Sequence, residues 1–122
     1  MARTNIKRKN WLRKRIRTKL SLGRLGNYPR LVIFRSNKHI YGQLIDDISS
    51  STILSASTKS KSISVNSKSG NKIEQSKLVG YELAEKIKKT KIEKIIYDRN
   101  GYKYHGRVRA LAEAIREKGI NF

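Results

Sequence analysis

The sequence predicts a single α/β domain with a mixed sheet, preceded by a basic N-terminal arm. Three observations predict it: short β-branched segments joined by tight turns over residues 30–58, helical periodicity after residue 71, and then one more strand and one more helix. The order in the domain is therefore βββαβα. A helix between the third and fourth strands requires a crossover back to the same sheet, with helices packed against it. The chain of 122 residues divides into an arm, 1–26, and a domain, 27–122.

The arm is predicted to be partly helical. An apolar residue recurs every four positions on one narrow stripe, basic side chains cover the rest, and two glycines are expected to end the helix. The residues concerned are Leu12, Ile16 and Leu20 in the stripe, Trp11 beside it, and Gly23 and Gly26 after it. Uncompensated positive charges oppose helix formation. We therefore expect the arm to be disordered or partly helical until a polyanion binds, the alternative being a solvated helix with a few docking residues.

Three strands are expected between residues 30 and 58. Leu31–Phe34 is apolar and rich in β-branched residues, so a strand over Arg30–Arg35 is predicted, covered on both faces. Four polar residues then form a turn before a second strand over His39–Asp46. Another polar turn leads into a third strand over Ser51–Thr58. Short strands with tight connections are typical of an antiparallel meander.

The second half of the chain carries two helices and one strand. Residues 59–70 are rich in Ser, Lys and Asn and are expected to be a mobile loop. Helix signals begin at Asn71, an apolar strand follows over Lys94–Tyr97, and a loop over 98–106 leads to the final helix. The helical positions are Val79, Leu83 and Ile87, then Val108, Leu111, Ala112 and Ile115, with Gly119 as the expected C′ residue.

Charge is the strongest functional signal. Twenty-nine Lys and Arg against nine Asp and Glu give a net charge of +20, and residues 1–45 hold thirteen of the basic residues and no acid. A compact domain with this charge repels itself, so a polyanionic partner is expected rather than a small-molecule substrate. The chain has no cysteine, which excludes disulfides and thiolate metal sites. No apolar run approaches the length that spans a membrane.

Two segments combine cations, aromatic residues and glycine at the ends of predicted strands. They are FRSNKHIYGQ at residues 34–43 and DRNGYKYHGR at residues 98–107. Lys and Arg neutralise phosphates, Ser and Asn reach phosphate oxygens or 2′-hydroxyls, and aromatic or guanidinium planes stack on bases. Gly101 and Gly106 permit close approach of the backbone. The mixture predicts RNA recognition. The alternatives are an ordinary solvated turn, tyrosines that belong to the core, and a hydrogen-bonded structural His105.

The residues favour no enzyme. The βββαβα order is similar to the ribonuclease-H-type sheet, whose nucleases hold divalent metal with clustered carboxylates, and Asp46, Asp47 and Asp98 are the acids available. The first strand carries no acid, however, and no nucleophile motif, P-loop or dinucleotide fingerprint occurs. Only His39 and His105 could serve as nitrogen ligands, so no catalytic residue, metal site or cofactor is predicted.

The basic arm has two further interpretations. Basic amphipathic helices bind anionic membrane surfaces, and a mitochondrial presequence is also basic and amphipathic. Against the membrane, the apolar stripe is narrow and the rest of the protein is basic as well, which favours nucleic acid. The presequence stays open on composition alone.

Three segments carry a resemblance to a known family. FRSNKHIYGQLIDD at 34–47, ILSAST at 53–58 and DRNGYKYHGRVRALAEAIREKGINF at 98–122 closely resemble the bacterial large-subunit ribosomal protein eighteen family, from about Arg13 to the end. The resemblance implies a ribonuclease-H-like motif without catalytic acids. It also implies a structural constituent of the cytoplasmic bacterial ribosome, with an organellar ribosome possible. Such a protein binds 5S rRNA and helps attach it to 23S rRNA in the central protuberance, beside neighbouring large-subunit proteins.

The resemblance also implies which residues face RNA. Three groups are expected to do so: the arm, the end of the first two strands, and the loop before the last helix. They comprise Arg8, Arg13, Arg15, Arg17 and Lys19; Arg35, Ser36, Asn37, Lys38, His39 and Tyr41; and Arg99, Tyr102, Tyr104, His105, Gly106 and Arg107. Three places depart from the family pattern. Asn100 stands where the family generally has a small residue such as Gly or Ser, the turn GRLGNYPR at 23–30 is atypical, and the serine-rich loop is unusually plain.

Overall fold

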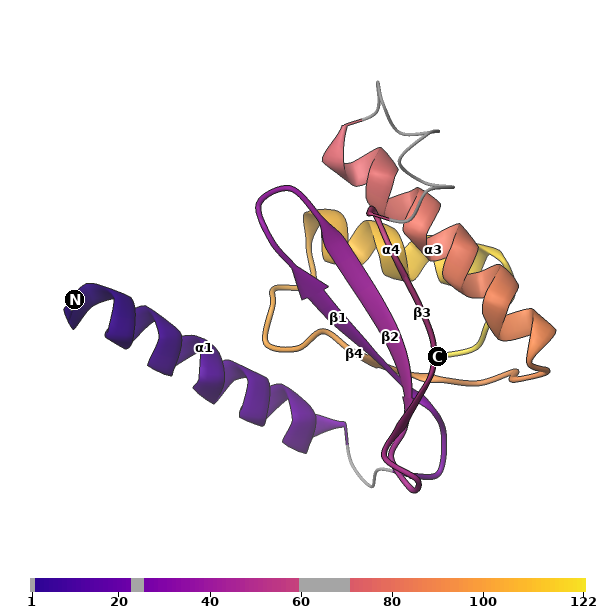
Figure 1. The fold of residues 1–122 in the computed structure, drawn as a ribbon, viewed down its shortest axis with the longest axis horizontal. Coiled ribbons are helices and arrows are strands. Elements are labelled where there is room, and N and C mark those ends of the chain that lie inside the picture. The colour runs from indigo at the N-terminus through magenta and orange to yellow at the C-terminus, as the bar shows by residue number, and fades with distance from the viewer. Residues whose placement is uncertain (1, 23–25, 60–70) are drawn as a thin grey trace.

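A computed structural model describes residues 2–22, 26–59 and 71–122, with side chains from Arg8 onward. These residues form three helices and a four-stranded sheet (Figure 1). The elements are α1 (Ala2–Ser21), β1 (Arg30–Arg35), β2 (Ile40–Asp46), β3 (Ser51–Ser57), α3 (Lys72–Lys89), β4 (Ile96–Asp98) and α4 (Gly106–Glu117). The predicted α/β class and βββαβα order are confirmed. The expected mobile loop lies, apart from Lys59, outside the described residues, and so does Gly23.

The sheet has the order β3-β2-β1-β4. Strands β1 and β2 pair antiparallel, from Arg30 opposite Ile45 to Arg35 opposite Ile40, and β3 continues the meander. Strand β4 pairs with β1 in parallel, because α3 carries the chain across to the far edge. The predicted crossover is therefore confirmed. It sets the end of β4 beside β1, which brings the loop after β4 close to the arm.

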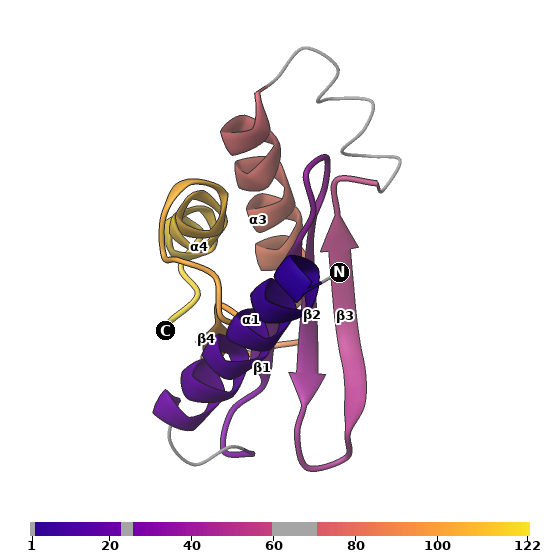
Figure 2. The ribbon, with the colours of Figure 1, turned by 90° about the vertical axis from the view of Figure 1, so that its left-hand side faces the viewer.

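Helices α3 and α4 cover one face of the sheet and enclose the core (Figure 2). Two glycines permit this close packing. A Cβ on Gly42 would lie 2.7 Å from Leu83 Cδ1, and a Cβ on Gly80 would lie 2.7 Å from Ala114 Cβ. The predicted helix ends are also confirmed: the Asn71 side chain accepts a hydrogen bond from a backbone N–H of the first turn, and Gly119 adopts φ +94°.

The opposite face of the sheet is only partly covered, so the prediction that β1 is covered on both faces is wrong. Leu31 and Ile33 are fully buried under the helices, whereas Val32 is half-buried and Phe34 is 47% exposed on the other side. Of the helices that the structure describes, α1 alone lies on this side, and Figure 1 shows it apart from the sheet over much of its length. The continuous apolar sequence of β1 therefore supplies two different faces. One lies in the core, and the other, which carries Phe34, is only partly covered.

Helix α1 contacts the domain with a different stripe from the one that the sequence suggests. Leu12 is 39% exposed and lines the groove facing the sheet, whereas Ile16 and Leu20 are 61% and 76% exposed, so most of the apolar stripe does not dock. Trp11, Arg15 and Thr18, which share a face at i, i+4 and i+7, turn toward the domain instead. Across the described ranges, no helix has both the length and the apolar character needed to cross a membrane.

Candidate nucleic-acid interface

The turn between β1 and β2 is a hydrogen-bonded hairpin with an exposed basic tip. The Ser36 N–H donates to the His39 carbonyl at 2.8 Å, and Ser36 Oγ accepts from the His39 N–H at 3.2 Å. The imidazole Nδ1 of His39 lies 2.8 Å from Thr58 Oγ1, which also accepts from the backbone N–H of Ile40. Arg35, Ser36, Asn37 and Lys38 are exposed at the tip. His39 is half-buried and so has a structural contact besides the expected contact with RNA.

The loop after β4 is folded back on itself. Arg99 Nη1 donates to the Tyr102 carbonyl at 2.7 Å, which closes the loop from within. Tyr102 is partly buried and packs against the edge of the core. The alternative interpretation, in which the tyrosines belong to the core, is therefore partly correct for Tyr102. Asn100 is buried at φ +55°, in the left-handed region that Asn tolerates better than most residues. Arg99 and Tyr102 therefore shape the loop as well as line it.

The hairpin and this loop, predicted separately from two distant motifs, meet at one end of the sheet. Arg107 Nη1 donates to the Ser36 carbonyl at 2.8 Å. The guanidinium of Arg35 lies 4.9 Å above the Tyr102 ring, whose hydroxyl lies 3.4 Å from both backbone polar groups of Arg35. Burial and the nearby charge of Arg35 lower the pKa of Arg107. The two cations are thus held close together, which is a geometry suited to an anion.

An aromatic row extends from the hairpin across the open face of the sheet. The ring of Tyr41 lies 5.9 Å from Phe34 and 6.4 Å from His39 between centroids. Lys59 Nζ lies 5.9 Å above the Tyr41 ring. Half-exposed rings with cations beside them provide surfaces on which bases stack. The sequence does not predict Phe34 or Lys59 as contact residues. Phe34 could have been predicted if β1 had been expected to leave one face partly open.

Helix α1 adds a third basic segment to the same surface. Trp11 lies 6.0 Å from Tyr102 and 6.5 Å from Phe34 between ring centroids. The Arg15 guanidinium lies 4.8 Å from the centre of the Trp11 ring, and its Nε donates to Asn100 Oδ1 at 2.8 Å. The other predicted arm cations, Arg8, Arg13, Arg17 and Lys19, are exposed. Between α1 and the sheet runs a groove of about 530 Å³.

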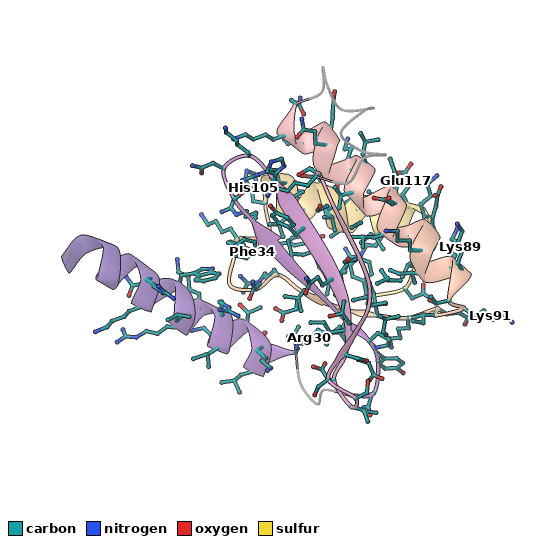
Figure 3. The ribbon with its side chains drawn as sticks, viewed as in Figure 1. Arg30, Phe34, Lys89, Lys91, His105 and Glu117 are labelled. Atoms are coloured by element: carbon teal, nitrogen blue, oxygen red, sulfur yellow. The ribbon has the colours of Figure 1, made fainter. Side chains whose placement is uncertain are left out.

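The loop residues Tyr104, His105 and Gly106 take no part in the contacts among Arg35, Tyr102 and Arg107. Tyr104 turns toward the C-terminus, where its ring lies 6.3 Å from that of Tyr97 and Arg116 Nη1 donates to its hydroxyl at 3.4 Å. His105 precedes α4 and is exposed, and its side chain makes no capping hydrogen bond. The structure therefore does not support the alternative that His105 is a hydrogen-bonded structural histidine. Gly106 has φ +56°, and a Cβ at this position would point into open space. Figure 3 shows His105 at the hairpin end, far from Arg30 at the start of β1.

The acids considered for a nuclease have structural partners. Arg30 donates to Asp98 Oδ2 at 2.7 Å and to both carboxylate oxygens of Asp47, at 3.1 and 3.0 Å. Although burial disfavours its charge, hydrogen bonds to these carboxylates raise the pKa of Arg30. Asp46 accepts hydrogen bonds within the turn that follows β2. Within the described ranges, no group of three or more His, Cys, Asp or Glu side chains could hold a metal ion.

Comparison with known proteins identifies the family of the chain. Residues 2–122 match the family model described as Ribosomal L18 of archaea, bacteria, mitochondria and chloroplast. Large ribosomal subunit protein uL18 of Lactobacillus johnsonii is 51% identical over 109 residues, which cover 89% of this chain and 87% of the relative. The protein of the same name from Bradyrhizobium sp. BTAi1 is 48% identical over 120 residues, 98% and 95% of the two chains. The protein of the same name from Sorangium cellulosum is 46% identical over 110 residues, which cover 90% of this chain and 92% of the relative. The chain therefore belongs to the ribosomal L18 family and is a structural constituent of the large ribosomal subunit.

Proposed function

We propose that this protein binds 5S rRNA through the surface formed by α1, the β1–β2 hairpin and the loop after β4, and helps attach that RNA to 23S rRNA in the central protuberance. The observation that supports it most is the convergence of three basic segments, far apart in sequence, around Tyr102. The ion pairs found among the described residues include none with Arg35, Lys38 or Arg107. These cations are available to phosphates.

The two parts of the surface have different tasks in this proposal. The domain, residues 27–122, presents a fixed set of cations and rings, which read the shape of the RNA and stack on its unpaired bases. The arm, residues 1–26, supplies phosphate neutralisation from exposed side chains on both flanks of α1. If the complex neutralises about six phosphates, the logarithm of affinity falls with the logarithm of salt concentration at a slope of about −4 to −5.

A binding titration tests the proposal. Purified full-length protein is titrated on filters against 5S rRNA and against a scrambled RNA of equal length, at two salt concentrations. We expect 5S rRNA to stay bound at the higher salt while the scrambled RNA is lost, because stacking and shape contacts do not depend on released counterions. Equal loss of both RNAs would leave only a generic basic RNA-binding surface and would overturn the proposal.

A further inference from the structure

We infer that Asn100 is a positioning residue, which holds helix α1 against the domain before RNA arrives. The inference concerns the free protein. Its consequence for RNA affinity rests on the function proposed above.

A continuous chain of polar contacts carries the inference. It starts at the beginning of β1, where Arg30 bridges Asp47 and Asp98. The other oxygen of the Asp98 carboxylate, Oδ1, accepts from the backbone N–H of Asn100 at 2.8 Å. Asn100 Oδ1 then accepts from Arg15 Nε on α1, also at 2.8 Å, across 85 positions of sequence. Arg30, Asp98 and Asn100 are largely buried, so the contacts among them are shielded from water and weigh more than exposed ones. The bond from Arg15, whose side chain is otherwise exposed, is partly buried.

Asparagine suits this position for two reasons. Its backbone adopts φ +55°, which Asn and Gly accept more readily than other residues. Its side chain reaches α1 as a neutral acceptor for a charged donor, and such bonds are stronger than those between neutral groups. A glycine would accept the same backbone conformation but would leave Arg15 without this partner.

The neighbouring contacts show that α1 is seated and does not merely lie nearby. A Cβ on Gly101 would come within 2.8 Å of the Arg15 backbone nitrogen and 3.1 Å of the Lys14 carbonyl carbon. The helix backbone therefore rests directly on this loop. One turn earlier, Trp11 packs beside Phe34 and Tyr102. Asn100 thus fixes the helix at the point where its backbone touches the domain.

The apolar stripe does not provide an alternative anchor. Leu12 is 39% exposed, and Ile16 and Leu20 are more exposed still. Burial of so little apolar surface contributes little to docking. With the helix held in place, the exposed cations of α1 meet RNA in a fixed array, which lowers the entropy lost on binding.

The single tryptophan of the chain reports on docking directly. Fluorescence emission and acrylamide quenching of Trp11 are measured in the full-length protein and in Asn100→Gly, without RNA. Loss of a hydrogen bond to a charged donor shifts the docking equilibrium by about tenfold or more. We therefore expect a red-shifted emission and stronger quenching in the variant. We also expect 5S rRNA affinity to fall by up to about tenfold with an unchanged salt slope, because no charge has been removed.

Two matched variants separate this role from a backbone effect. Ser50→Gly makes a comparable change at φ +55° in the β2–β3 turn and leaves the polar chain intact, so its Trp11 signal should equal that of the unmodified protein. Asn100→Asp keeps the acceptor and should remain docked. Unchanged Trp11 fluorescence in Asn100→Gly, or equal changes in Ser50→Gly, would overturn the inference. A shifted Trp11 signal in a protein that does not prefer 5S rRNA would support the positioning role while refuting the proposed function.

Discussion

On the α3–α4 side of the sheet, alternate residues of β1 and β2 are buried in one apolar cluster, as Leu31, Ile33 and Leu44 illustrate. On the α1 side, the residues between them, such as Val32, Phe34 and Tyr41, remain partly exposed. The same strands therefore supply a closed face and a half-open one. Period-2 alternation decides which residue belongs to which face.

Under the proposed function, the difference between the faces separates stability from RNA binding. The closed face excludes water from apolar side chains, which is the main source of folding free energy. The α1 face is held by a few rings and by the contacts of Arg15 and Trp11. It leaves cations and ring faces in solvent. We expect changes on one face to alter stability with little effect on RNA affinity, and changes on the other to do the reverse.

The largest expected effect is on the α1 face. Deleting residues 1–22 removes nine Lys and Arg side chains. We expect 5S rRNA affinity at low salt to fall by about a thousandfold or more, with a clearly flatter salt slope, because fewer counterions are released. Thermal unfolding should change little, since the closed face is intact. The measurement is a filter-binding salt series, combined with a melting curve of the truncated protein.

A full-length control separates charge from the helix itself. Replacing Arg13, Arg17 and Lys19 by Gln removes three exposed cations and keeps the contacts of α1 with the domain. This variant should reproduce part of the flatter slope. An unchanged slope in both variants would show that the arm is not the main electrostatic contact.

The second effect is on the closed face. Leu83 is fully buried, and its Cδ1 lies against Gly42 in β2. Leu83→Ala should lower the free energy of unfolding by about 2–5 kcal/mol, because the cavity cannot close completely. Affinity for 5S rRNA, measured well below the melting temperature, should stay the same. Leu20→Ala is the matched variant on α1: with Leu20 76% exposed, its effect on stability should be within about 0.5 kcal/mol.

The closed face could be predicted from sequence because its signals are local. The strand over Arg30–Arg35, the cap at Asn71 and the left-handed Gly119 all follow from neighbouring residues, and the structure confirms each. The sequence predicts the last strand over Lys94–Tyr97, whereas the structure has it at Ile96–Asp98. Lys94 instead forms an isolated bridge with a residue near the C-terminus, a distant pairing that local pattern does not contain.

The α1 face could be predicted less well, because periodicity shows which residues share a side of a helix but not which side meets the domain. The hydrophobic pattern favoured the stripe of Leu12, which is exposed, over the side of Trp11 and Arg15. The partner of Arg15 lies 85 residues away and is polar. A single sequence gives no sign of such a pair. By contrast, both basic motifs were recognisable, although their meeting at Tyr102 required the fold.

The smallest effect we predict compares two arginines of α4. Arg107 lies against the hairpin, beside Arg35, whereas Arg109 forms an exposed pair with Glu113 at 2.9 Å. Arg107→Gln should weaken 5S rRNA binding by about tenfold and reduce the magnitude of the salt slope by about one, as expected for loss of one phosphate contact. Arg109→Gln removes the same charge two positions away and should change neither quantity much. Both are measured in one filter-binding salt series. Equal losses in the two variants would mean that only net charge matters, and the distinction between a binding face and the rest of the surface would then be wrong for α4.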